Sequence, residues 1–203
     1  MRRGALAAEG ELVWSPGPDR YVASFEGAAF SMLILEWHSE GGFDAAGVAP
    51  ERFTDRRLRR SAMSANFRRD QGRITFSGPQ VEYPLVPGAQ DRLSWLVQLA
   101  GIVAADPARF GAGSRIEMFV VGARADGDVW TFEVQGREAL DLPAGRLDDT
   151  LRLKRAARRP FETEAEVWLD PGHAWLPARV RLTVPGSGDA LEFQLAAPVP
   201  GGG

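Results

Sequence analysis

The residues that could perform covalent or metal chemistry do not fall into catalytic spacings. The chain has two histidines, His38 close to Glu36 and Glu40, and His173 directly after a Pro-Gly pair. A histidine with two carboxylates can bind a metal ion, but neither histidine belongs to a spaced ligand motif, so surface or hydrogen-bonded roles are favoured. The catalytic motifs G-x-S-x-G, H-E-x-x-H and Ser-x-x-Lys do not occur, and there is no cysteine. We therefore expect no catalytic residue, no metal site and no cofactor.

Asp55 is the acidic side chain whose position suggests burial. It follows Phe53 at the two-residue step of an extended strand, so it points to the same side as that ring. A buried carboxylate needs a cation, which Arg57 or Arg92 could supply. No base or nucleophile accompanies Asp55, so a structural ion pair that fixes a helix against the sheet is favoured over a catalytic acid.

Basic residues gather in two clusters that could contact polyanions. All but Lys154 of the 24 basic residues are arginines, yet the net charge is −3. Nucleic-acid binders usually have a basic balance and aromatic residues on the basic face, so nucleic acid is not expected as a partner. An anionic membrane surface is a candidate partner. A solvated strand face whose charges are balanced by nearby acidic residues is favoured. The clusters are Arg52, Arg56, Arg57, Arg59, Arg60, Arg68 and Arg69, and Arg152, Lys154, Arg155, Arg158 and Arg159.

Length and composition indicate one domain of ordinary size. The chain has 203 residues, of which 44% are hydrophobic. We expect a flexible N-terminal segment over residues 1–8, a single half-barrel domain over 9–196 and a flexible tail over 197–203. The absence of cysteine fits the cytoplasm and the bacterial periplasm equally. No signal-peptide apolar run and no membrane-spanning segment are expected in this chain.

Short runs with a period of two predict β-strands along most of the chain. About ten such runs recur at spacings of roughly 8 to 12 residues, bounded by Gly, Pro and Asp. Asp126-Gly127 predicts a hairpin, because such turns need positive φ. Pro171-Gly172 suits the two central positions of a type II turn.

Within residues 84–105 the alternation stops, and a continuous apolar stretch follows the polar residues Gln90, Asp91 and Arg92. This pattern predicts one helix over most of residues 89–104. Its apolar side chains form two stripes, so the helix is expected to be buried nearly all round. One stripe is Leu93, Leu96, Val97, Ala100 and Ala104, and the other is Trp95, Leu99, Ile102 and Val103. The predicted fold is mostly β, a curved antiparallel sheet (half-barrel) of roughly ten strands packed around one long helix.

Large apolar side chains on the predicted inner faces are candidates for a ligand site. Such residues most often fill a core, but they can also line a cavity for an apolar ligand. Trp168 shares its face with Glu164 and Glu166, so it is predicted to be exposed or at an interface. The predicted cavity residues are Leu35, Trp37, Phe67, Phe76, Trp95, Leu99, Val103, Trp130, Phe132 and Leu182.

Three segments, "VAPERFTDRRLRR", "PLVPGAQDRLSWLVQLAGI" and "VWLDPGHAWLPARVRLT", resemble in this order the bacterial domain-of-unknown-function family 3108. The resemblance covers roughly residues 11–196, and "GAQDRLS" is its most specific element. Members of that family are similar to exported envelope proteins of Gram-negative bacteria, and in shape to lipoprotein carriers whose curved sheet accommodates acyl chains. The resemblance implies a half-barrel fold and a periplasmic location, with any leader or anchor absent from this chain. It implies no catalytic residue.

Two functions are therefore expected as alternatives. The first is a noncatalytic periplasmic or envelope binding protein that holds a lipid or other amphiphile between a curved sheet and a buried helix. The second is a structural or protein-interaction module of the cell envelope, with a filled core and an arginine-rich face that docks to an envelope protein. An apolar cavity of several hundred Å³ would favour the first function, and a packed interior the second. An enzyme is held in reserve, since it would need a site that no motif reveals.

Overall fold

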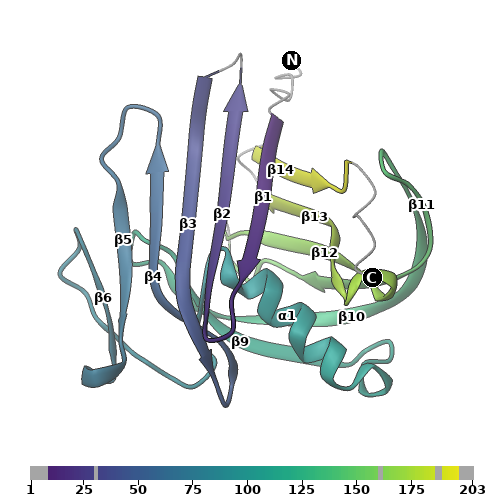
Figure 1. The fold of residues 1–203 in the computed structure, drawn as a ribbon, viewed down its shortest axis with the longest axis horizontal. Helices are drawn as coiled ribbons and strands as arrows, with labels where there is room; N and C mark the ends of the chain where they lie inside the picture. Colours follow the sequence, from purple (N-terminus) through teal and green to yellow (C-terminus); the bar gives the residue numbers. More distant parts are fainter. Residues whose placement is uncertain (1–8, 30–31, 160–161, 186–188, 197–203) are drawn as a thin grey trace. The chain divides into compact units, whose positions relative to one another are not determined.

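The computed structural model describes residues 9–29, 32–159, 162–185 and 189–196. Within these ranges the chain is mostly β, with one α-helix, α1 (Ser94–Ala105), and two seven-stranded sheets (Figure 1). The mostly β class and the helix are thus confirmed, whereas the prediction of roughly ten strands in one sheet is wrong. The predicted flexible ends, 1–8 and 197–203, lie outside the described residues.

Sheet A contains the first seven strands in sequence order, each antiparallel to the next. Its inner face carries the buried rings of Tyr21, Phe25, Phe53 and Phe67. Successive side chains of a strand point to opposite faces, which explains the period of two in the sequence. The strands are β1 (Glu9–Pro16), β2 (Arg20–Ala29), β3 (Met32–Asp44), β4 (Gly47–Arg57), β5 (Met63–Arg68), β6 (Arg73–Phe76) and β7 (Tyr83–Pro84).

Sheet B contains the other seven strands, also in sequence order, and its β8–β9 pair is parallel. The sheet curves through β10 and β11 (Figure 1), where two register shifts interrupt the pairing. This is the half-barrel curvature that was expected. The strands are β8 (Gln90–Asp91), β9 (Arg115–Val121), β10 (Gly127–Leu142), β11 (Gly145–Arg155), β12 (Glu164–Asp170), β13 (Leu176–Val184) and β14 (Asp189–Gln194).

The strand order breaks between β7 and β8, which is why there are two sheets. Pro84 ends β7 and Pro87 lies between the two strands, and a proline has no N–H with which to extend a strand ladder. Gly88 follows with a φ of 72°. Because β7 and β8 have only two residues each, they show no alternation from which the break could be predicted.

Two compact units divide the chain. Unit 1 comprises Met1–Gln98 with Met118–Trp130, and unit 2 comprises Leu99–Glu117 with Thr131–Gly203. Unit 1 therefore holds all of sheet A, β8 and the turn between β9 and β10, while β11 to β14 lie in unit 2. The single domain over 9–196 stays a prediction.

Helix α1 covers most of the predicted range 89–104, and it begins only at Ser94 because Asp91 caps it. Asp91 Oδ1 accepts the backbone N–H groups of Leu93 and Ser94 at 2.7 and 2.8 Å. In return, Ser94 Oγ accepts the backbone N–H of Asp91 at 2.9 Å. This reciprocal arrangement is a capping box, which satisfies N–H groups that the first turn of a helix leaves free.

The two predicted turns have different outcomes. β9 and β10 are neighbours joined by a tight turn, so the hairpin is confirmed, although the positive φ of 62° is at Ala125. Gly127 lies close to two rings, since a Cβ there would be 3.0 Å from the Phe119 ring and 3.1 Å from the Tyr83 ring. The type II turn at Pro171-Gly172 is wrong. Asp170 accepts the N–H of Gly172 at 2.8 Å and stabilises a 3₁₀ turn over Pro171–His173 instead.

Candidate functional site

The ten predicted cavity residues fall into a buried group and a partly exposed group. Six of them are at most 3% exposed, so they are core side chains in this structure: Phe67, Trp95, Leu99, Val103, Trp130 and Phe132. Four keep some exposed surface: Leu35, Trp37 and Phe76 in unit 1, and Leu182 in unit 2. A ligand can touch only side chains that solvent can reach, so the candidate site narrows to this second group. Ligand binding by any of the ten stays a prediction.

Leu99→Trp should therefore lower the free energy of unfolding. Leu99 is 0% exposed, and adding a larger ring to a filled core commonly costs about 2 kcal/mol. Urea unfolding of both proteins measures the loss. The expectation that the helix is buried nearly all round is wrong, because Gly101, Ala104 and Ala105 are exposed. Ala104→Trp on this exposed side is therefore the control and should change stability little. An unchanged urea midpoint for Leu99→Trp would mean that free space surrounds this position.

The partly exposed apolar surface of unit 1 follows one cross-strand row on the inner face of sheet A. The strand registers place Leu12, Phe25, Trp37, Asp55 and Met63 opposite one another on β1 to β5. We call these five residues the inner-face row. Leu12 is 39% exposed, and Trp37 and Met63 are half-buried. The rings of Phe25 and Trp37 are 5.8 Å apart, so the row is a nearly continuous apolar strip with one carboxylate in it.

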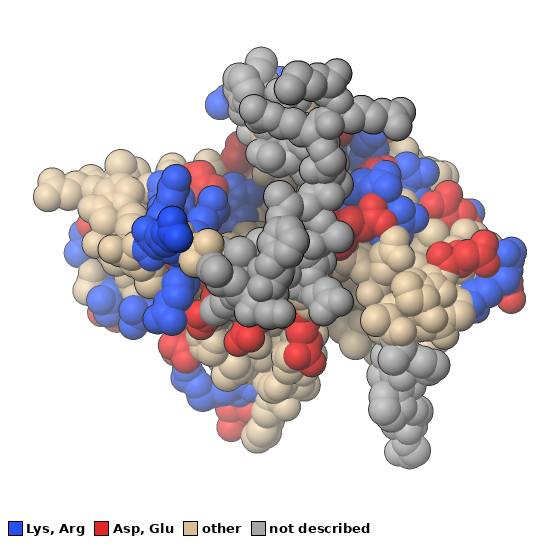
Figure 2. Space-filling model, turned by 90° about the horizontal axis from the view of Figure 1, so that it is seen from above, with Lys and Arg blue, Asp and Glu red and all other residues tan. Residues whose placement is uncertain are grey.

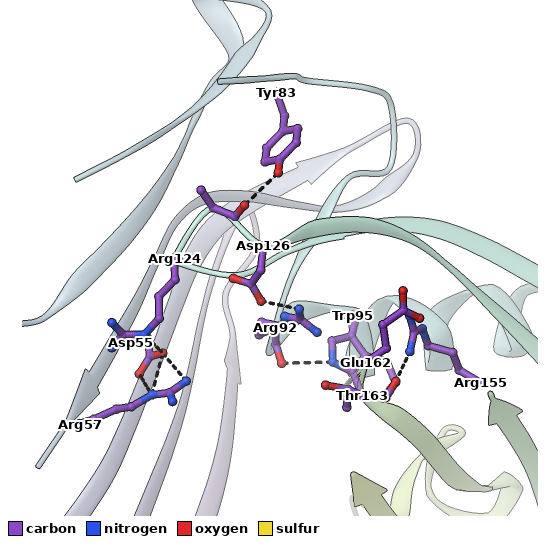
Figure 3. A network of polar contacts seen from close by, with 11 residues as sticks. Asp55, Arg57, Tyr83, Arg92, Trp95, Arg124, Asp126, Arg155, Glu162 and Thr163 are labelled. Carbon is purple, nitrogen blue, oxygen red and sulfur yellow. Dashed lines mark hydrogen bonds and ion pairs between the residues drawn. The ribbon is translucent and has the colours of Figure 1, made fainter. Parts of the chain in front are cut away.

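The carboxylate of this row is neutralised by two arginines. Asp55 is 4% exposed, and its Oδ2 lies 2.9 Å from Arg57 Nη2 and 3.5 Å from Arg124 Nε (Figure 3). Arg57 Nε also donates to both carboxylate oxygens at 3.1 Å. Arg92, the other cation considered from the sequence, pairs with Asp126 at 2.5 Å instead. The ion pair therefore joins β4 to the turn after β9 and does not involve the helix, because Arg92 points to that turn.

The turn over residues 122–126 holds Arg124 in place. The Tyr83 hydroxyl donates to the carbonyl of Ala125 at 2.8 Å, and Arg92 anchors Asp126 (Figure 3). Arg92 is itself fixed, since its guanidinium lies 4.8 Å from the centre of the Trp130 ring and its carbonyl accepts the Trp95 indole N–H at 3.1 Å. These contacts fix the turn from which Arg124 reaches Asp55 on the inner face of sheet A.

Some buried N–H donors at this place have no hydrogen-bond acceptor within the described part of the chain. They are Nε and Nη2 of Arg124 and Nε1 of Trp37. Trp37 lies directly opposite Asp55, and Leu35 is opposite Arg57. The cluster of Trp37, Asp55, Arg57 and Arg124 thus carries two guanidiniums against one carboxylate. It offers positive charge and spare donors beside an apolar strip.

A second cluster of polar side chains surrounds Asp91, and it was not predicted from the sequence. Asp91, Ser39 and Ser94 are 0% exposed, and Tyr21 is 1% exposed. Ser39 Oγ donates to Asp91 Oδ2 at 2.5 Å and lies 2.9 Å from the Tyr21 hydroxyl. Burial raises the pKa of Asp91, although the hydrogen bonds from Ser39, Ser94 and Leu93 lower it in part. Burial and the neighbouring Asp91 raise the pKa of Tyr21.

The Asp91 network is closed to solvent, so it joins elements of the fold and cannot meet a substrate in this structure. Two glutamines extend the junction to Val48 at the start of β4. Gln98 Oε1 accepts the N–H of Val48 at 2.8 Å, and Gln90 Nε2 donates to its carbonyl at 2.7 Å. The spacing Asp91-x-x-Ser94 is a capping signal that could have revealed the helix start, but Ser39 and Tyr21 have no local signal.

In the part of the chain that the structure describes, each histidine lies beside an acidic residue. His38 Nε2 lies 3.8 Å from Glu40 Oε2, and His173 Nδ1 contacts the carboxylate of Asp170. Over the described ranges, no three His, Cys, Asp or Glu side chains are grouped as a metal site requires. The same ranges contain no helix with the length and apolarity needed to cross a membrane.

Many residues of the two basic clusters form ion pairs with acidic side chains. Arg56 lies 3.4 Å from Glu36, Arg69 lies 3.2 Å from Asp44, and Arg155 lies 3.4 Å from Glu162. In Figure 2 blue and red side chains are interspersed over much of the visible face. This agrees with the favoured interpretation of a solvated, paired surface.

Trp168 is buried within the chain, contrary to the prediction that it is exposed or at an interface. It is 4% exposed and packs with Leu140, Leu142 and Ala178 in a small cluster of unit 2. Arg179 and Arg152 cover its ring, with guanidinium carbons 4.8 and 5.4 Å from the ring centre. The arginine stems and these apolar residues bury the tryptophan on a face that carries both acidic and basic side chains.

A protein-family model described as a protein of unknown function (DUF3108) matches residues 3–194 of the chain. This is the family that the three sequence segments resemble. No curated protein and no solved structure matched the chain.

Proposed function

We propose that this chain, which belongs to the DUF3108 family of proteins of unknown function, is a noncatalytic binding protein that holds a lipid or another amphiphile. The inner-face row carries the proposal, because three of its apolar side chains, Leu12, Trp37 and Met63, stay partly exposed on three strands of sheet A. Exposed apolar surface beside polar groups is typical of sites that bind ligands or other proteins. A periplasmic location is part of the proposal. It is supported by the similarity of family members to exported envelope proteins.

The alternative is a structural or interaction module of the cell envelope with a filled core. The burial of six of the ten predicted cavity residues favours it. The two functions differ in whether a free amphiphile binds saturably.

Titration with a fluorescent fatty acid is expected to show saturable binding that Leu35→Gln weakens. Leu35 lies next to the inner-face row on β3, and a polar side chain there would reduce contact with an apolar chain. A loss of about 1.4 kcal/mol corresponds to a tenfold weaker Kd. Val22→Gln is the matched control, since Val22 is 42% exposed on the other face of the same sheet.

Saturable binding by the parent and the control, weakened in Leu35→Gln, would support the proposal. No saturable binding by the parent protein would exclude the proposed function and leave the interaction module. Equal weakening in Leu35→Gln and Val22→Gln would exclude the inner face of sheet A as the site.

A further inference from the structure

We infer that the bound amphiphile has an anionic headgroup, a carboxylate or a phosphate, and that Arg124 and Arg57 bind it beside Trp37. The inference rests on the proposed function and names the chemical class of its ligand. Nothing in the sequence motifs points to it, because Arg124 is far from Asp55 along the chain and joins it only through the fold.

The charge balance of the cluster favours an anion. Two guanidiniums face one carboxylate, so the site keeps one net positive charge after the Asp55 ion pairs form. Arg57 and Arg124 are 46% and 32% exposed at their side chains, whereas Asp55 is 5% exposed. An incoming ligand therefore meets the cations and not the carboxylate.

The hydrogen-bond balance favours the same class of ligand. Arg57 makes three contacts with Asp55, and Arg124 only approaches it at 3.5 Å. Arg124 Nε and Nη2 and Trp37 Nε1 have no acceptor in the described ranges. Carboxylates and phosphates present two or more acceptor oxygens that match the planar guanidinium fork. A small shift of the Arg124 side chain toward solvent would bring its Nε and Nη2 groups to such a ligand.

The position of the cluster explains why the anion would be the head of an amphiphile. Trp37 and Asp55 belong to the inner-face row, which continues to Met63 on one side and to Phe25 and Leu12 on the other. An apolar chain that runs along the row from Leu12 to Trp37 would leave its polar end beside Asp55, at Arg57 and Arg124. A free anion would gain nothing from the row.

The test compares three ligands with the same twelve-carbon chain, each below its micelle-forming concentration. They are dodecyl phosphate, dodecanoate and the neutral dodecyl maltoside, titrated by calorimetry at low salt. We expect the two anions to bind about tenfold more tightly than the maltoside and the difference to shrink as salt is added. Inorganic phosphate should not displace them at the same concentration.

Three variants test whether the preference for anionic headgroups depends on the proposed residues. Arg124→Gln should bring the anions close to the affinity of the maltoside, whereas Arg20→Gln, at an exposed arginine paired with Glu51, should not. Asp55→Asn should tighten binding of dodecyl phosphate and leave the maltoside unchanged, because it removes the competing carboxylate. Trp37→Phe keeps the ring but removes the indole N–H, and it should weaken only the anions. This variant serves if Arg124→Gln does not fold.

The outcomes separate this inference from the proposed function. Equal affinity for all three ligands would overturn the anionic headgroup while leaving amphiphile binding intact. No binding of any of the three would overturn the proposed function as well. Inorganic phosphate that binds as tightly as dodecyl phosphate would show a simple anion site with no role for the apolar row. An unchanged preference in Arg124→Gln or, if that variant does not fold, in Trp37→Phe would overturn the assigned site.

Discussion

Replacing Asp91 with alanine is expected to lower the free energy of unfolding by about 3 kcal/mol or more. The Asp91 carboxylate accepts hydrogen bonds from Ser39 Oγ and from the backbone N–H groups of Leu93 and Ser94. All of these donors lie in a closed interior, and each buried donor left without an acceptor costs about 1 to 3 kcal/mol. Loss of the helix cap adds about 0.5 to 2 kcal/mol. At pH values above the raised pKa of Asp91, relief of the buried charge offsets part of this sum.

Urea unfolding measures the effect, with Asp149→Ala as the control. Asp149 is exposed and paired with Arg137, and surface ion pairs contribute only about 0 to 1 kcal/mol. If Asp91→Ala and Asp149→Ala had the same small effect, the Asp91 network would not be a stabilising junction.

The Asp91→Asn variant should also change how stability depends on pH. The raised pKa of Asp91 in the fold means that the folded protein keeps a proton which the unfolded chain releases near pH 3.9. The stabilisation is complete below that pH and is lost as pH rises through the pKa of the folded state. Relative to Asp91→Asn, the parent protein should therefore become less stable as pH rises above about 4. A constant difference between the two proteins would contradict the raised pKa.

Features set by neighbouring residues could be predicted from the sequence, and features set by distant residues could not. The alternation of Tyr21, Ala23 and Phe25 and the turn at Asp126 depend on local chemistry, and the structure has both a strand and a hairpin there. In contrast, Asp91 reaches Ser39 from 52 residues away. No pattern in a single sequence reports such a contact.

The candidate site shows the same division. The inward phase of Asp55 follows from its two-residue step after Phe53, and Arg57 is close in the chain. Arg124 reaches Asp55 only because the turn after β9 is held by Tyr83 and Arg92. Trp168 was assigned to the wrong environment for a related reason, since Arg179 and Leu140 cover it from other strands.

Gly41→Ala is expected to lower stability by about 3 kcal/mol, whereas Gly101→Ala should raise it by about 1 kcal/mol. A Cβ on Gly41 would lie 2.3 Å from the carbonyl oxygen of Ala49 and 2.8 Å from the backbone nitrogen of Glu51. These atoms belong to the facing strand β4 beside a register shift, so no side-chain rotation can remove the overlap, and overpacking costs about 1 to 3 kcal/mol or more.

Gly101 provides the same chemical change in open space. It lies on the exposed side of α1, and a Cβ there would meet no atom within 4 Å. Alanine is favoured over glycine in a helix by about 1 kcal/mol. Thermal and urea unfolding of both variants should give shifts of opposite sign. A stable Gly41→Ala protein would show that β3 and β4 can separate at this register shift, and a destabilised Gly101→Ala protein would show that the outer side of α1 is covered.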